Sequence, residues 1–267
     1  MVARIAEQLG MRLLNVASRH GTTGYPDVAP AYVGRSKIET LLGPGVWTEI
    51  AGKRVIDFGC GIGQEAIELA QHGAAHVIGV DTKPLWREMA SEHARNSGVA
   101  DRCTFVETCG ETAPVIVCLD AFEHFRDPAD VLETMSRLLE PDGRVLVSFG
   151  PTWYHPLGGH IYSVLPFAHI VFPERALVRW RAQFKTDGAR TIRESGLNQM
   201  TIRRFVDLVE DSPLAFESME AVPIRRLKWM ACRATREFTT SIVRCRLVHR
   251  HAARGPVRQA PGSQPAR

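Results

Sequence analysis

The sequence predicts an α/β fold in which helices cover both faces of a mostly parallel sheet. An apolar run at 54–58 leads into three alternating glycines and then into the apolar face of 64–70, which is the pattern of a strand, a tight turn and a helix. A second apolar run, 76–80, follows at the spacing that a βαβ unit produces. The run 115–119 is apolar throughout, as expected of a central parallel strand buried on both faces.

The first and middle elements follow from local signals. Residues 1–30 are expected to form an amphipathic helix that ends at Gly10 or Ser18, followed by a loop rich in Gly and Pro. A short helix at 35–42 precedes the turn at 43–45. Proline begins the segment 84–96 and glycine follows it, as at the two ends of a helix. A third strand is expected at 103–108.

The second half continues the alternation and then departs from it. A helix is expected from Asp127–Pro128 to the stop at Pro141–Gly143, followed by a fifth strand at 144–149. A long insertion dense in aromatics and histidines then occupies about 150–197. After it we expect a helix at 201–211 and strands at 215–222 and 241–250. An insertion this long is usually functional or a subdomain, so we expect it to form a lid over the substrate. Residues 251–267 are expected to be a disordered basic tail.

Composition limits the class of protein. With 267 residues, 45% hydrophobic and 23% charged, the chain has the balance of an ordinary globular domain. The net charge of +4 is mild, and the arginines from Arg225 to Arg254 come without an aromatic-rich binding module. They therefore indicate a solvated face rather than nucleic-acid binding. Composition leaves the oligomeric state open.

Cysteine usage and hydropathy indicate the compartment. The six cysteines form no C-x-x-C pair, and the N-terminus lacks the apolar core and cleavage site of a signal peptide. No apolar run reaches the about 18 residues of a membrane-spanning helix; the nearest, Ile161 to Phe172, contains Pro166 and His169. We expect a reducing, cytoplasmic setting, and contact with a membrane surface stays open.

The glycine turn at 59–63 is the first candidate binding site. Glycines there let the backbone adopt positive φ and let a ligand approach the main chain, while N–H groups at the following helix start attract polar groups. A nucleotide-like cofactor is expected. The dinucleotide fingerprint G-x-G-x-x-G, counted from Gly59, needs its third glycine at position 64, where this sequence has Gln64. A pyrophosphate-binding turn is therefore not indicated. Asp81, 22 residues beyond Gly59 at the tip of the second strand, has the place of a ribose ligand, although it could instead cap the helix at Pro84.

Two stretches resemble one family. Asp57, Gly59, Gly61 and Gly63 resemble motif I of the class I S-adenosylmethionine-dependent methyltransferases, of the type 11-like group, and the run from Leu119 to "LLEPDGRVLVSF" is similar to the later motifs of that family. The resemblance covers about 36–250. It implies a Rossmann-like, seven-stranded, mostly parallel sheet with an inserted lid after strand 5, in a methyltransferase domain at 31–250.

The resemblance also implies a set of S-adenosyl-L-methionine ligands. Asp57 and the glycine backbone would hold the methionine amino group, the tip of the second strand the ribose, the loop after the third strand the adenine, and the loop after Leu119 the reacting end. In this sequence those positions are Asp57, Gly59, Cys60, Gly61, Gly63, Asp81, Thr82, Cys109, Gly110, Glu111 and Asp120.

The order acid-x-x-Glu-His at Asp120, Glu123 and His124 resembles the Glu-x-x-Glu-His metal-binding element of polyprenyl-benzoate O-methyltransferases and of small-RNA terminal 2′-O-methyltransferases. The first acid is one methylene shorter here. A lid histidine, His155 or His160, would complete a shell for Mg²⁺, Mn²⁺ or Zn²⁺. Alternatively His124, His155 and His160 handle a proton without metal, or these side chains only bond neighbouring loops.

The predicted function is methyl transfer to a small-molecule acceptor at oxygen, with or without a metal. The lid aromatics favour an aromatic or lipidic acceptor, unless they form the core of the lid itself. Two alternatives remain: an RNA methyltransferase, which the terminal arginines would suit, and a catalytically silent protein that binds the cofactor.

Overall fold

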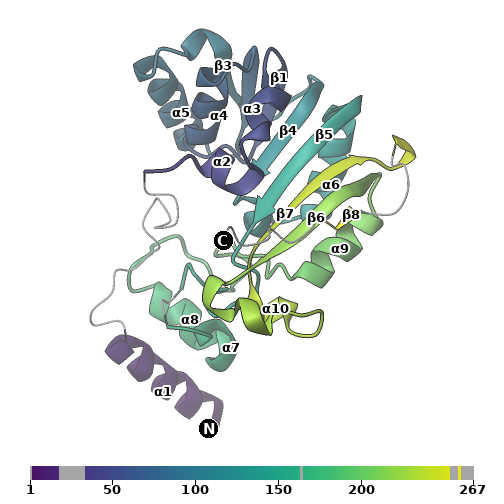
Figure 1. Cartoon of the computed structure of the whole chain (residues 1–267). Coiled ribbons are helices and arrows are strands. Elements are labelled where there is room, and N and C mark those ends of the chain that lie inside the picture. Colours follow the sequence, from purple (N-terminus) through teal and green to yellow (C-terminus); the bar gives the residue numbers. More distant parts are fainter. Residues whose placement is uncertain (1, 18–33, 163–164, 253–257, 260–267) are drawn as a thin grey trace.

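The computed structural model describes residues 2–17, 34–162, 165–252 and 258–259. One sheet has the strand order β3-β2-β1-β4-β5-β7-β6-β8 (Figure 1). Strands β1 to β5 are parallel, β7 is antiparallel to β5 and to β6, and β8 pairs with β6. Their bounds are β1 Arg54–Phe58, β2 His76–Val80, β3 Cys103–Val106, β4 Ala113–Leu119, β5 Leu139–Phe149, β6 Leu214–Pro223, β7 Thr240–His249 and β8 Arg258–Gln259. The predicted seven-stranded sheet is confirmed, and β8 adds two residues to it.

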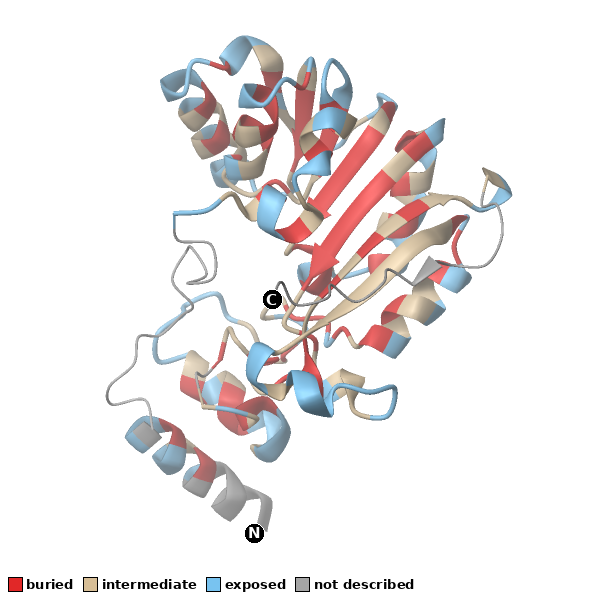
Figure 2. Ribbon diagram, viewed as in Figure 1, coloured by how far each residue is buried: buried red, intermediate tan, exposed pale blue. Residues whose placement is uncertain are grey.

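Helices cover both faces of the sheet. On one side lie α2 (Lys37–Leu42), α3 (Gly45–Ile50), α4 (Gln64–Gln71) and α5 (Pro84–Asn96), and on the other lie α6 (Pro128–Leu138) and α9 (Ile202–Glu210). Alternate residues of β4 serve the two layers, Val115 and Val117 in one and Ile116 and Cys118 in the other. Figure 2 shows the central strands as the most continuously buried part of the molecule.

Helix starts coincide with side-chain caps. The Ser36 hydroxyl accepts from Glu39 N at 2.9 Å before α2, and Asp127 Oδ1 accepts from Asp130 N at 3.3 Å before α6. Thr201 Oγ1 accepts from Arg204 N at 3.1 Å before α9. Each satisfies one N–H that the first helical turn leaves without a partner, which is why these starts were predictable to within two residues.

The insertion forms a layer with a core of its own. It contains α7 (Ala168–Val171) and α8 (Glu174–Arg181), and α1 (Val2–Ala17) packs against α8 at the end of the molecule away from α4 and α5 (Figure 1). The helix α1 ends at Ala17, as the second of the two expected ends, Ser18, predicts, and Gly10 lies within it. Glycine there permits close packing, since a Cβ would come within 3.1 Å of the Phe172 ring. The buried members of this lid core are Leu14, Tyr162, Ala168, Leu177, Trp180, Ile192 and Leu197.

Short elements complete the chain: η2 Ala100–Arg102, η3 Phe122–His124, η4 Arg225–Met230, α10 Arg236–Thr239 and η5 Arg250–Ala252. The loop expected at 21–30 and most of the tail expected at 251–267 lie outside the described residues. Within the described ranges, no helix is both long and apolar enough to cross a bilayer.

Candidate functional site

The glycine turn joins β1 to α4 at the carboxyl edge of the parallel strands. Gly59, Gly61 and Gly63 all have positive φ, of 85°, 53° and 81°. A Cβ at Gly59 would lie 2.7 Å from the Cβ of Ala121, whereas Gly61 has its nearest neighbour, the Trp86 ring, at 3.8 Å. Gly59 is thus required by packing and by backbone conformation, while a Cβ at Gly61 would make only an ordinary contact with Trp86, so the main chain is less crowded there and a ligand can approach it.

Asp57, the fourth residue of β1, lies directly under this turn. Its side chain is buried, and its Oδ2 has no hydrogen-bond partner among the described residues. Burial raises the pKa of Asp57 to about 8; the Glu65 carboxylate acts in the same direction and the Lys37 ammonium opposes it. A buried carboxylate oxygen without a donor is costly for the fold alone, so Asp57 fits the amino group of a bound molecule.

Lys37, which the sequence analysis missed, lies between carboxylates of this site. Its Nζ is 3.1 Å from Glu65 Oε1 and 3.3 Å from Asp120 Oδ2. Burial alone would lower the pKa of Lys37, but the Asp120 and Glu65 carboxylates raise it above the ordinary value. The first turn of α2 thereby connects the glycine turn to the end of β4, and the cluster holds more carboxylates than ammonium groups.

Asp81 follows β2 and binds the glycine turn. Its Oδ2 accepts from Gly61 N at 3.1 Å, and its Oδ1 accepts from Lys83 N at 2.8 Å, just before α5. Lys83 is itself the N-cap residue of α5, and no side chain of the described residues caps that helix, so the alternative of a helix-capping Asp81 is not confirmed. The carboxylate instead joins the loop before α5 to Gly61. Cys60 is buried beside it, whereas Thr82 is exposed.

The connection from β3 to β4 runs from the carboxyl ends of the parallel strands to their amino ends. Cys109 is partly buried and packs against the core on one face of the sheet. Glu111 Oε2 is 3.4 Å from Arg54 Nη1, at the first residue of β1, so it lies at the edge opposite the glycine turn. The structure thus does not support Glu111 as an adenine ligand; Cys109 and Gly110 precede it on the same crossing and remain predictions.

The loop after β4 packs on the glycine turn. Asp120 has a φ of 50°, its N–H donates to Ser148 O at 2.9 Å, and its Oδ1 accepts from the Ser148 hydroxyl at 3.4 Å. Next along the chain, Ala121 and Phe125 contact the space above Gly59. A ligand beside Gly61 would therefore border η3, which carries Glu123 and His124.

Glu123 is directed into the protein. Its Oε1 accepts from Gly150 N at 3.1 Å, and its Oε2 has no hydrogen-bond partner within the described ranges. Burial raises the pKa of Glu123 to about 7, with a contribution from the Asp120 carboxylate and an opposing one from His124. Asn198 fixes this turn, since its Nδ2 donates to Phe122 O at 2.8 Å and to Phe125 O at 3.0 Å.

The histidines of η3 and of the insertion lie near one another. The rings of His124 and His160 are 5.5 Å apart, edge to face, and His124 Nδ1 lies 2.6 Å from Gly196 O. Burial lowers the pKa of His155 to about 4 and that of His160 to about 3. These lid histidines are therefore neutral at physiological pH.

The three groups of the acid-x-x-Glu-His segment serve different partners. Asp120 faces Lys37, Glu123 faces Gly150 N, and His124 faces Gly196 O. Among the described residues, no three His, Cys, Asp or Glu side chains are grouped as a metal ion would require. The arrangement therefore does not fit the predicted metal site of Asp120, Glu123, His124 and His155, because each side chain is committed elsewhere.

Comparisons with known proteins agree with this geometry. A family model for a methyltransferase domain matches residues 34–199. A ubiquinone biosynthesis O-methyltransferase of Neisseria meningitidis is 39% identical over 107 residues, which are 38% of this chain and 45% of the relative. A relative of the same description from Coxiella burnetii is 27% identical over 178 residues, covering 61% of this chain and 74% of the relative. The chain thus spans about half the length of the first of these relatives.

Solved structures share the fold. An S-adenosylmethionine-dependent methyltransferase from Mesorhizobium loti superposes with a TM-score of 0.51 at 18% identity, covering 77% of this chain and 96% of that one. At this identity the likeness concerns the arrangement of strands and helices. It agrees with the mostly parallel sheet described above.

Proposed function

Because the chain belongs to the methyltransferase-domain family, we propose that it transfers the methyl group of S-adenosyl-L-methionine to an oxygen of a small-molecule acceptor. The cofactor supplies a methyl already activated on a sulfonium, so the protein contributes chiefly by positioning the acceptor oxygen in line with it. The matched segment, 34–199, contains the glycine turn, Asp57, Asp81 and η3.

The observation that carries this proposal is the buried Oδ2 of Asp57, which has no hydrogen-bond partner in the part of the chain that the structure describes and lies just before the glycine turn. Asp57 would accept from the amino group of the cofactor, and Asp81 would accept from the ribose hydroxyls. The Glu65 and Asp120 carboxylates beside Lys37, together with Asp57, which would ionise next to a bound ammonium group, favour a ligand that carries positive charge, as a sulfonium with an ammonium group does.

His124 is the residue we propose as proton acceptor for the oxygen. The Gly196 carbonyl can only accept, so Nδ1 of the neutral ring carries the hydrogen in that 2.6 Å contact, and Nε2 holds the lone pair. His155 has the opposite tautomer, because its Nδ1 accepts from Leu157 N at 2.9 Å. His155 is then a donor, and His160, with its strongly lowered pKa, is a weak base.

For the acceptor we propose a phenol or catechol that carries an apolar substituent. Support comes from the names of the relatives, which describe ubiquinone biosynthesis O-methyltransferases. The aromatic content of the lid supports it less than the sequence suggested, since Tyr162 and Trp180 are buried in the core of the lid. Tyr154, by contrast, is 38% exposed and remains available to an acceptor.

The test begins with calorimetric titration of S-adenosyl-L-methionine and S-adenosylhomocysteine into the purified chain. Transfer of a labelled methyl is then measured to catechols, polyprenyl phenols and RNA, with and without chelator. We expect cofactor binding, methylation of a phenolic oxygen, and full activity in chelator. Folded protein that binds neither cofactor form would disprove the proposal, and methylation of RNA alone would replace the acceptor.

A further inference from the structure

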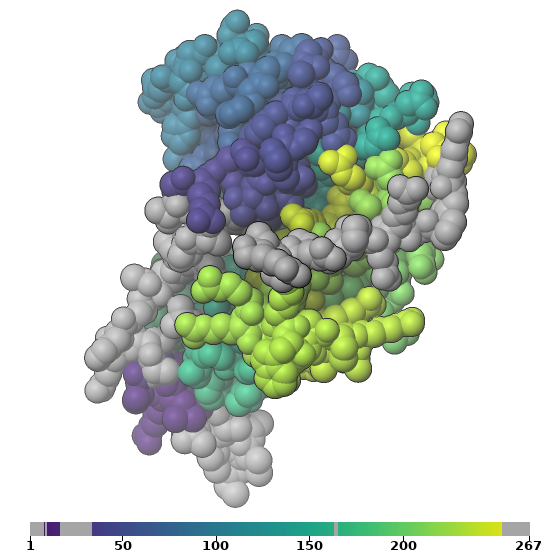
Figure 3. Space-filling view, in the orientation of Figure 1, coloured from purple at the N-terminus to yellow at the C-terminus, as the bar shows by residue number. Residues whose placement is uncertain are grey.

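The segment between β6 and β7, residues 225–239, forms a basic surface that the proposed reaction does not use. It carries five basic residues, Arg225, Arg226, Lys228, Arg233 and Arg236, against one acid, Glu237. The chain as a whole has a net charge of +4, so this segment alone holds as much net positive charge as the entire sequence. Figure 3 shows its yellow-green atoms gathered on the lower front of the molecule.

The one acid of the segment is engaged with the protein. Glu237 Oε2 accepts from Ile202 N at 3.0 Å, and Oε1 accepts from Arg203 N at 2.9 Å, so its carboxylate caps the start of α9. Arg225, Arg226, Lys228 and Arg233, in contrast, are exposed. The face turned to solvent is therefore cationic without a compensating carboxylate from the segment.

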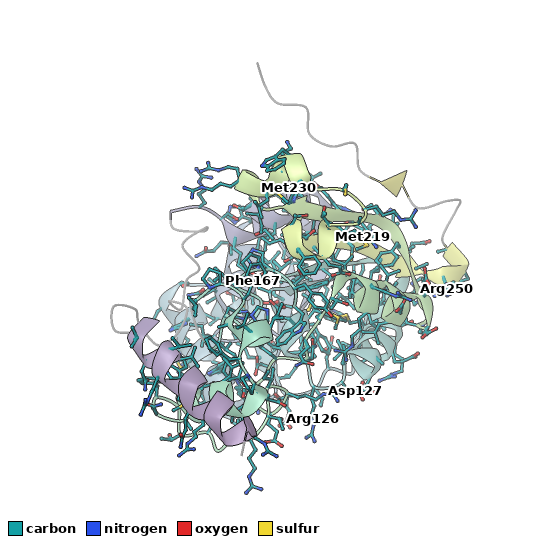
Figure 4. All side chains as sticks on the ribbon, turned by 90° about the horizontal axis from the view of Figure 1, so that it is seen from below. Arg126, Asp127, Phe167, Met219, Met230 and Arg250 are labelled. Atoms are coloured by element: carbon teal, nitrogen blue, oxygen red, sulfur yellow. The ribbon has the colours of Figure 1, made fainter. Side chains whose placement is uncertain are left out.

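Large apolar side chains project from the same segment. Trp229 is 82% exposed, and Met230 and Phe238 are 40% and 48% exposed. Figure 4, a view from below, places Met230 at the periphery of the molecule. An indole and a thioether surrounded by exposed cations have little reason to face water in a monomeric protein. This composition is that of interfacial membrane anchors, in which tryptophan sits at the headgroup level and Lys or Arg attracts anionic lipids.

The segment lies at the same sheet edge as the candidate site. Thr152 Oγ1 donates to Glu237 O at 3.4 Å, and the rings of Tyr154 and Phe238 are 5.3 Å apart. Both contacts join the segment to the start of the lid. A surface bound through Trp229 would therefore lie beside the lid rather than behind the sheet.

We propose that residues 225–239 dock the protein onto an anionic lipid surface, with Trp229 and Met230 entering the headgroup region and the surrounding arginines and Lys228 meeting lipid phosphates. Nucleic acid is disfavoured as the anionic partner, because single-strand binding surfaces offer successive aromatic platforms for bases, and here a methionine follows the tryptophan. A consequence that rests on the proposed function is that an apolar acceptor would reach the site from the bilayer.

The experiment is co-sedimentation of the full chain with vesicles of phosphatidylglycerol and phosphatidylcholine, compared with phosphatidylcholine alone. Binding is expected to the anionic vesicles only and to weaken with salt. Since each basic residue at such a surface contributes about fivefold in partitioning, the variant Arg225→Glu/Lys228→Glu should bind at least about 25-fold less. The matched control, Lys53→Glu/Arg137→Glu, makes the same change in net charge at exposed positions on the opposite sheet edge and should bind as the wild type does.

Depth of insertion is measured with brominated lipids, which should quench tryptophan emission of the wild type and quench it far less in Trp229→Phe. Absence of vesicle binding, equal binding to neutral vesicles, or equal losses in the two charge variants would overturn the proposal. The proposal would also be wrong if the wild type bound RNA but no vesicles, and if Arg225→Glu/Lys228→Glu weakened that RNA binding. Titration of S-adenosylhomocysteine separates the two proposals. A chain that binds vesicles but not this cofactor product would support the lipid-binding surface and disprove the proposed reaction.

Discussion

Asp57 shows how a residue proposed to serve binding can oppose stability. Its pKa is about 8 in the fold against an ordinary value of 3.8, so between these pH values the folded chain retains a proton that the unfolded chain has released. Stability from this group is therefore greatest near the lower value and declines as the pH rises towards about 8. A bound ammonium group would reverse that effect by pairing with the ionised form.

Replacing Asp57 by Asn keeps the shape and removes the charge. At pH 8 we expect the ligand-free variant to be more stable than the wild type by on the order of 2 kcal/mol, a Tm several degrees higher, with little difference at pH 4. Its affinity for S-adenosylhomocysteine should fall at least about tenfold, because a hydrogen bond to a charged group is lost. Scanning calorimetry and titration measure both. The exposed Asp142→Asn should change neither, and an Asp57→Asn variant that keeps full affinity would remove the residue from the site.

His124 offers a separate prediction at this scale. With Nε2 as proton acceptor, His124→Asn should lower the rate of methyl transfer by about 100-fold and leave the dissociation constant of S-adenosylhomocysteine unchanged. Single-turnover transfer of labelled methyl is the measurement. His72, which stacks on Trp47 with ring centroids 4.0 Å apart at the end of α4, provides the control substitution His72→Asn. Similar losses in the two variants would argue against a role of His124 in the chemistry.

Residues of the site were predictable where they share one contiguous motif. Asp57 and the glycines of the turn follow one another along the chain, so spacing alone marks them. Lys37 reaches the site only because the start of α2 lies beside the end of β4, a contact that no local pattern encodes. Glu111 shows the reverse case, since its place in sequence suggested an adenine contact and the crossing connection carries it to Arg54.

At the scale of elements, local chemistry decided what was predictable. Proline at the first position and a cap before it marked α6, and the strands β1 and β2 matched their apolar runs. The helix α3 was not predicted, because Pro44 and Gly45 suggested a turn; burial of Val46 and Ile50 in the layer over the sheet stabilises it. β3 ends two residues earlier than expected, where the Glu107 carboxylate lies 3.4 Å from Arg87 Nη2.

The insertion at 150–197, which is predicted to be a lid, is the element in which pH should act. The pKa values of His155 and His160 are about 4 and 3 in the fold, below their ordinary 6.5. The stability that these groups contribute is complete above pH 6.5. It is lost as the pH falls from 6.5 towards about 4, because in this range only the unfolded chain gains the protons. Glu123, with a pKa raised to about 7, acts in the opposite direction over part of the same range.

A comparison of variants isolates the histidines. Between pH 7.5 and pH 5, the free energy of unfolding of the wild type should fall by roughly 4 kcal/mol more than that of His155→Asn/His160→Gln, about half of it from each histidine. Urea unfolding at the two pH values, followed by tryptophan emission, gives both numbers, and the shared contribution of Glu123 cancels. Parallel pH dependence in the two proteins would show that the lid histidines do not set its acid stability.

At the scale of the whole molecule, the described chain contains distinct apolar cores. Two flank the sheet, and a third lies between α1, α8 and the rest of the insertion. The lid core joins residues from both ends of a long stretch of sequence, Leu14 with Trp180 and Leu197. The sequence predicted an insertion and an N-terminal helix, but not that they pack against each other. An amphipathic pattern shows that a helix face is buried, and it does not show which element covers that face.

Separate cores predict separate unfolding. Leu14 is fully buried in the lid core and Leu146 in a sheet layer, so each truncation to Ala should lower stability by about 3 kcal/mol in different places. Leu14→Ala should increase amide exchange in 150–197 while the strands β1, β4 and β5 keep their protection, because local opening of the lid leaves the sheet intact. Leu146→Ala should reduce protection throughout, since the lid is built on the carboxyl edge of that sheet. Exchange measured by mass spectrometry distinguishes these patterns, and uniform loss of protection in Leu14→Ala would mean that the sheet and the lid unfold as one cooperative unit.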